Sequence, residues 1–151
     1  MTTFLSSNFT VEEATRSETA SRLQLDNTPS KQVLENLRQT AYGMEQVRKL
    51  LSDYPIIVSS WYRSPAVNSA IGSKPTSQHV TGQAVDFICP TYGNVDAVVT
   101  AIIGSRIDYD QLIKEFVDPK TKKGGWVHIS FNNTPRRQAL VIDHTGVRAY
   151  A

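Results

Sequence analysis

Cysteine, net charge and long apolar runs are all scarce in this sequence, and each scarcity excludes a class of protein. Cys89 is the only cysteine among 151 residues, which excludes an internal disulfide and a cysteine-rich zinc site. The formal charge of +2, from 16 Lys+Arg against 14 Asp+Glu, is too small to favour a nucleic-acid binder. No apolar run approaches the roughly 20 residues that span a bilayer, so we expect no membrane insertion. A chain of this length buries about two thirds of its unfolded surface, which favours one domain over residues 1–151.

Hydrophobic periodicity separates a helical first part from a strand-rich second part. Apolar residues spaced by three and four from Val33 to Leu51 predict a long amphipathic helix that opens at Thr28-Pro29. Shorter helices are expected over residues 10–16, 65–71 and 94–103, and strands over residues 56–58, 84–88, 107–117, 126–131, 139–142 and 147–150. Because helices precede strands, the predicted fold class is α+β, with N-terminal helices packed on a mostly antiparallel sheet.

Two of the three histidines stand in segments that are typical of metal sites. His79 ends a flexible loop and is followed, after a glycine turn, by Asp86 on a predicted strand. Alternation along residues 126–131 puts Trp126, His128 and Ser130 on one face, the floor of a cleft. Zinc accepts imidazole nitrogen and carboxylate oxygen, and three protein ligands with one open position indicate a catalytic site. His79, Asp86 and His128 are therefore the candidate zinc ligands, although each alone has an ordinary explanation as a loop, ion-pairing or strand residue.

Together with the segment SSWYRSP at residues 59–65, these two segments resemble the zinc D-alanyl-D-alanine peptidases. The order SxHxxGxAxD, then WxH, is highly specific, and flanking segments extend the resemblance over nearly the whole chain. The resemblance is to small phage and bacterial cell-wall peptidases of this group. It implies the hedgehog/DD-peptidase fold, a zinc ion held by His79, Asp86 and His128, and a monomer that cleaves peptidoglycan stem peptides.

The resemblance also implies roles for residues around the metal. Arg63 would point into the cleft, where its guanidinium would hold a substrate carboxylate or stabilise the developing oxyanion. Ser77, Gln83 and Trp126 are further candidates for substrate binding, with ordinary turn chemistry as the alternative for Ser77.

The sequence departs from the family pattern at the position of the general base. Many members carry an acidic residue three positions before the last histidine ligand, and here that position is Gly125. We expect Glu115, on the strand predicted to pair with residues 126–131, to take the proton instead. Asp110 and Asp118 are the alternatives. The sequence does not fix the hairpin register, and a slip of one residue would turn Glu115 away.

The predicted function is a zinc-dependent peptidoglycan peptidase that cuts stem-peptide or cross-bridge amide bonds, as an endopeptidase or a D,D-carboxypeptidase. The first ten residues, MTTFLSSNFT, lack the basic and apolar stretches of a secretory signal. We therefore expect a bacteriophage endolysin, made in the host cytoplasm and released to the cell wall in the periplasm. The alternative, favoured by Gly125 alone, is a zinc-binding module of the same fold without turnover. A Cys89 thiol enzyme is a weaker hypothesis.

Overall fold

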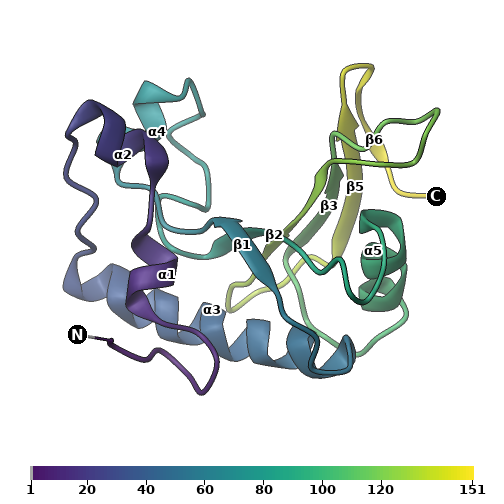
Figure 1. Ribbon diagram of the computed structural model, residues 1–151, viewed down its shortest axis with the longest axis horizontal. Helices are drawn as coiled ribbons and strands as arrows, with labels where there is room; N and C mark the ends of the chain where they lie inside the picture. The colour runs from purple at the N-terminus through teal and green to yellow at the C-terminus, as the bar shows by residue number, and fades with distance from the viewer. Residues whose placement is uncertain (1) are drawn as a thin grey trace.

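The computed structural model describes residues 2–151, which form five helices and one six-stranded sheet (Figure 1). The helices are α1 (Val11–Thr15), α2 (Glu18–Leu23), α3 (Lys31–Leu50), α4 (Pro65–Ala70) and α5 (Val95–Ile103). The strands are β1 (Ile57–Ser60), β2 (Ala84–Ile88), β3 (Gln111–Glu115), β4 (Trp126–Ser130), β5 (Gln138–Asp143) and β6 (Gly146–Ala149). The α+β class is confirmed. No helix in this range is both long and apolar enough to cross a membrane.

Side-chain caps set where the helices begin. Thr10, Ser30 and Asn94 each accept a hydrogen bond from the backbone N–H three residues later, at the starts of α1, α3 and α5. Because Ser30 is the cap, α3 begins at Lys31, two residues after the Pro29 at which Thr28-Pro29 predicted its start. Helix α2 was not predicted, since its six residues after the Ser17 cap are too few to show a helical period.

The sheet is mixed, with the strand order β1-β2-β4-β3-β5-β6. Four of its pairings are antiparallel, as predicted, and include the hairpin of β3 and β4. Strand β5 instead pairs parallel with β3, because β5 starts at the end of the sheet at which β4 ends and β3 begins. The strand predicted over residues 107–117 is shorter, since Phe116 has a φ of 55° and leaves the extended conformation.

The hydrophobic core lies between one face of the sheet and the helices α3 and α5, which Figure 1 shows along the base and side of the molecule. Val85 and Phe87 of β2, with Val127 and Ile129 of β4, face this core and are 0% exposed. Successive side chains of a strand point to opposite faces, so the residues between them lie on the face that α3 and α5 leave uncovered.

Candidate metal centre

Two of the predicted ligands lie side by side on the uncovered face of the sheet. Asp86 of β2 is the direct partner of His128 of β4 in the antiparallel ladder. Directly paired residues send their side chains to the same face, at a separation that lets them interact. The alternation of the two strands therefore buries their valines and brings a carboxylate and an imidazole together.

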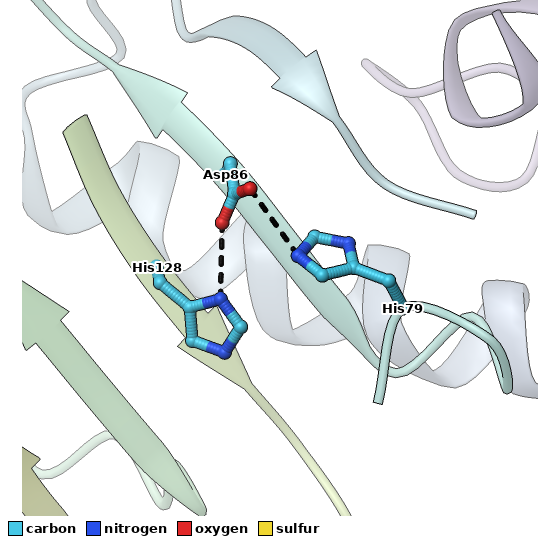
Figure 2. Close-up of side chains that lie close together, drawn as sticks. All are labelled: His79, Asp86 and His128. Atoms are coloured by element: carbon cyan, nitrogen blue, oxygen red, sulfur yellow. Dashed lines mark hydrogen bonds and ion pairs between the residues drawn. The ribbon is translucent and has the colours of Figure 1, made fainter. Parts of the chain in front are cut away.

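His79 reaches the same place from the loop before β2, and Asp86 lies between the two imidazoles (Figure 2). His79 Nε2 is 3.2 Å from Asp86 Oδ2, and His128 Nδ1 is 3.0 Å from Asp86 Oδ1. The ring centroids are 5.2 Å apart, with the ring planes at 71°. One ligand atom from each residue lies within 4.8 Å of the others. The fold thus brings together all three predicted ligands.

The backbone fixes the orientation of the His79 ring. His79 Nδ1 is 2.6 Å from the carbonyl oxygen of Trp61. A carbonyl only accepts, so Nδ1 carries a proton and Nε2 is the ring nitrogen that faces Asp86. A ring nitrogen and a carboxylate oxygen that face each other at 3.2 Å require a proton or a cation between them. A bond from the second ring nitrogen to a carbonyl is typical of histidines that bind metals.

The carboxyl of Asp86 is ionised in this environment. Burial by itself would raise its pKa, but hydrogen bonds from His128 and His79, together with their electrostatic attraction, outweigh burial and hold the pKa well below its usual range. The side chain is 14% exposed, which leaves its negative charge little solvation. A buried carboxylate of this kind is stable only beside a cation or a protonated partner.

The donor set fits zinc. Zinc binds imidazole nitrogen and carboxylate oxygen at about 2.0–2.2 Å, so adjacent ligand atoms of a tetrahedral site are about 3.3–3.6 Å apart. The separations of His79 Nε2 from Asp86 Oδ2, 3.2 Å, and of His128 Nδ1 from Asp86 Oδ1, 3.0 Å, are each close to this spacing, and one ligand atom from each residue lies within 4.8 Å of the others. Two imidazoles and one carboxylate also leave the fourth position that a catalytic site keeps open.

Glu115 joins the same face from β3. It pairs with Trp126, and two residues earlier Ile113 pairs with His128, so Glu115 and His128 lie on one side of the sheet. Glu115 Oε1 is 3.6 Å from His128 Nδ1. Burial raises the pKa of the Glu115 carboxyl, the charge of Asp86 raises it further, and His128 and Arg63 oppose the rise. The register that the sequence left open therefore turns Glu115 toward the ligands.

Position 125 has no room for an acidic side chain. Gly125 has a φ of +73°, where side chains are strained, and a Cβ would lie 2.6 Å from the backbone nitrogen of Val117. The carbonyl oxygen of Glu115 would be in similar conflict, and backbone atoms do not move aside. The departure from the family pattern thus has a local steric cause, and a carboxylate from the paired strand lies beside the histidine instead.

Arg63 is half-buried next to the cluster. Its Nη2 donates to Ser77 Oγ at 3.3 Å, and that oxygen also accepts from the backbone N–H of His79 at 3.3 Å. The Nε of Arg63 is buried and has no hydrogen-bond partner within residues 2–151. Burial lowers the pKa of the guanidinium, while the nearby carboxylates of Asp86 and Glu115 oppose the shift. Arg63 therefore lies beside the candidate ligands and is held there through Ser77, and its contact with substrate stays a prediction.

Trp126 and Gln83, the other candidates for substrate binding, lie in two different parts of the molecule. Trp126 is half-buried beside Glu115 and packs on Phe116 with ring centroids 5.4 Å apart. Gln83 lines a separate hollow with residues of α3, and its Oε1 accepts from Thr81 Oγ1 at 2.6 Å. Contact of Trp126 or Gln83 with substrate stays a prediction.

The alternative acids have other partners. Asp110 is 0% exposed and is ion-paired with Arg136 at 2.7 Å. Asp118 is exposed and accepts hydrogen bonds within its own turn, from the backbone of Lys120 at 2.8 Å. Geometry therefore favours Glu115 among the acids.

The thiol hypothesis is also disfavoured. Cys89 is 1% exposed, and burial raises the pKa of its thiol, which works against a thiolate nucleophile.

Sequence reasoning missed two contributors to the site. The carbonyl of Trp61 orients His79, but every residue carries a carbonyl, so no sequence signal marks this one. The ion pair of Asp110 with Arg136 joins positions 26 residues apart, and only the parallel return of the chain beside β3 brings them together.

About two thirds of this chain match a known protein family. The family model of Peptidase M15 matches residues 7–111, a range that contains Arg63, His79 and Asp86. Glu115 and His128 come after it, joined to the matched part by the pairing of β4 with β2 and β3. No curated protein sequence matches the chain.

Proposed function

The chain belongs to the peptidase M15 family of zinc peptidases, and we propose that it hydrolyses stem-peptide or cross-bridge amide bonds of peptidoglycan. One observation carries the proposal: the Asp86 carboxylate lies between two ring nitrogens at 3.2 and 3.0 Å, on an uncovered face of the sheet. We assign His79, Asp86 and His128 as the metal ligands. When bound there, zinc supplies a Lewis acid that acidifies water and polarises a carbonyl.

The side chains around the ligands divide the remaining work. The Glu115 carboxylate takes the proton of the attacking water as the oxygen bonds to the peptide carbonyl carbon, and its raised pKa suits a group that must then return this proton. The proton passes to the leaving nitrogen as the carbon–nitrogen bond breaks. Arg63 donates hydrogen bonds to the developing oxyanion or to a substrate carboxylate.

The biological setting is part of the same proposal. The motifs resemble those of small phage and bacterial cell-wall peptidases, which supports an endolysin-type lytic enzyme. One hydrophobic cluster contains residues from Phe9 in the first part of the chain to Ile129 in the last, which supports a single peptidase domain over residues 1–151. We leave the scissile bond, and the choice between endopeptidase and carboxypeptidase, to experiment.

Purified sacculi provide the test. We expect the zinc-loaded protein to release muropeptides with new termini, which mass spectrometry identifies and which name the bond. A chelator and His128→Ala should each abolish release, whereas His144→Ala, a change at an exposed histidine in the β5–β6 turn, should leave it unchanged. Intact sacculi despite full zinc occupancy would instead favour a binding module without turnover.

A further inference from the structure

A groove of about 470 Å³ extends from His128 along the uncovered face of the sheet. Its floor is apolar and comes from Ile113 of β3 with Leu140 and Ile142 of β5. The segment of residues 73–78 forms one wall, and Arg136 lines the groove from the segment between β4 and β5. Because His128 and Ser77 are also lining residues, the groove continues from the proposed metal centre.

Arg136 is held in one orientation by a buried carboxylate. Its Nε and Nη2 donate to the two oxygens of Asp110 at 2.7 and 2.8 Å, and its backbone N–H donates to the first of them at 3.0 Å. Asp110 is 0% exposed and also accepts from Gln78 Nε2 at 2.9 Å, next to the ligand His79. A two-pronged pair of this kind fixes the plane of the guanidinium as well as its position.

The fixed guanidinium still has donors to offer. An arginine side chain has five N–H donors, and Asp110 engages one on Nε and one on Nη2, while Nη1 has no hydrogen-bond partner among residues 2–151. The side chain of Arg136 is 54% exposed despite its ion pair. Asp110 cancels the net charge of Arg136, but Lys74, another residue that lines the groove, has no ion-pair partner within residues 2–151 and adds a positive charge.

We propose that this groove is a substrate subsite in which Arg136 binds a carboxylate of the stem peptide, with Asp110 as the residue that positions it. The inference rests on the proposed function and deepens it. Stem peptides carry such carboxylates on D-glutamate and on the diamino acid, a few atoms from their amide bonds. The apolar floor suits the aliphatic chain that bears the carboxylate, while the forked donors and Lys74 suit its oxygens.

Binding of synthetic stem peptides tests the subsite without turnover. Zinc-loaded Glu115→Gln protein is titrated calorimetrically with three peptides: all carboxylates free, the D-glutamate carboxylate amidated, and the diamino-acid carboxylate amidated. Adding Asp110→Asn and Arg136→Gln together removes both charges and leaves no buried carboxylate unpaired. We expect this pair of changes to weaken binding of the free peptide about tenfold to a hundredfold. The loss should disappear for the one amidated peptide that lacks the bound carboxylate.

The hairpin of β5 and β6 offers a matched control. Arg148 pairs with Asp143 at 2.9 Å, with side-chain exposures of 51% and 4%, and neither residue lines the groove. Asp143→Asn with Arg148→Gln should leave the affinity for all three peptides unchanged. An equal loss for all three peptides with the Asp110 and Arg136 changes, or no loss, would overturn the subsite.

The outcomes separate this inference from the proposed function. Charge-dependent binding by a wild-type protein that leaves sacculi intact would uphold the subsite and remove the hydrolase. If the wild-type protein hydrolyses sacculi and the Asp110 and Arg136 changes do not alter this hydrolysis, the hydrolase is upheld and the subsite is ruled out.

Discussion

At the scale of the residue, the site depends on how two imidazoles and two carboxylates share one face of a sheet. Asp86 keeps its negative charge because His79 and His128 lie at 3.2 and 3.0 Å. Glu115 Oε1 lies farther from His128 Nδ1, at 3.6 Å, and burial raises the pKa of the Glu115 carboxyl. Two carboxyl groups whose environments shift their pKa values in opposite directions suit different tasks, one as a permanent ligand and one as a proton carrier.

Glu115→Gln tests the second task. The amide keeps the shape and the contacts of the side chain but does not accept the proton of water. We expect turnover of peptidoglycan to fall about 100-fold to 10,000-fold, with zinc content by metal analysis unchanged. Asp118→Asn is the control at an exposed acid of the same hairpin. Full activity of Glu115→Gln with zinc bound would assign the proton transfer to another group.

Asp110 predicts a pH dependence of stability. The hydrogen bonds from Arg136 are the main cause that lowers its pKa from 3.8 to about 2, so the folded state favours the ionised form. A lowered pKa stabilises the fold above the unfolded-state pKa, and this contribution is lost as pH falls toward 2. Asp110→Asn should therefore cost about 2 kcal/mol at pH 7 and progressively less below pH 4, measured by urea unfolding. A constant difference down to pH 2 would contradict this origin.

At the scale of the element, the hairpin of β3 and β4 decides which acid faces the ligands. The pair of Glu115 with Trp126 closes the ladder, and the chain then leaves both strands with positive φ, 55° at Phe116 and 73° at Gly125. This conformation packs the backbone of the two strand ends together so closely that position 125 has no space for a Cβ. Strained backbone of this kind is frequent at functional sites.

Comparison of Gly124 with Gly125 separates the effect of a positive φ from the effect of close backbone packing. Gly124 and Gly125 both have positive φ, but a Cβ on Gly124 would have no atom within 4 Å. Gly124→Ala should cost about 1 kcal/mol, the penalty of the left-handed conformation alone. Gly125→Ala should cost at least about 2 kcal/mol more because of the backbone conflict. Denaturant unfolding measures both, and equal losses would show that the close approach is absent in solution.

At the scale of the whole molecule, the candidate ligands bring together a loop and two strands that are far apart in the sequence. His79 comes from a loop, Asp86 from β2 and His128 from β4, and His128 follows Asp86 by 42 positions. A cation bound by all three stabilises the folded state only, because the unfolded chain does not hold these groups together. Metal binding and folding are therefore linked.

Removal of the metal should lower thermal stability. At zinc one hundred times above its dissociation constant, the expected stabilisation is about 2.7 kcal/mol, which corresponds to a melting temperature higher by roughly 5–10 °C. Differential scanning calorimetry with and without chelator measures this shift. His79→Ala should melt at one temperature in both conditions, while His144→Ala should keep the full difference. A wild-type protein indifferent to chelator would contradict the proposed centre.

Prediction from the sequence was most successful where the signal is local. The apolar stripe of α3, the helices expected near residues 10–16 and 94–103, and the alternation of β4 each depend on neighbours within a few residues. The parallel pairing of β5 with β3 was not predicted, because strand direction depends on where a loop returns. The short helix α2 was missed for lack of periodic residues.

The sequence by itself determined which residue types were available for metal chemistry, and the motif spacing was enough to single out His79, Asp86 and His128. Only the tertiary structure decided which acid lies beside them. A strand pattern repeats every two residues, so the sequence is compatible with either face for Glu115. The pairing of Ile113 with His128 and of Glu115 with Trp126 across the sheet puts Glu115 on the face that carries the ligands.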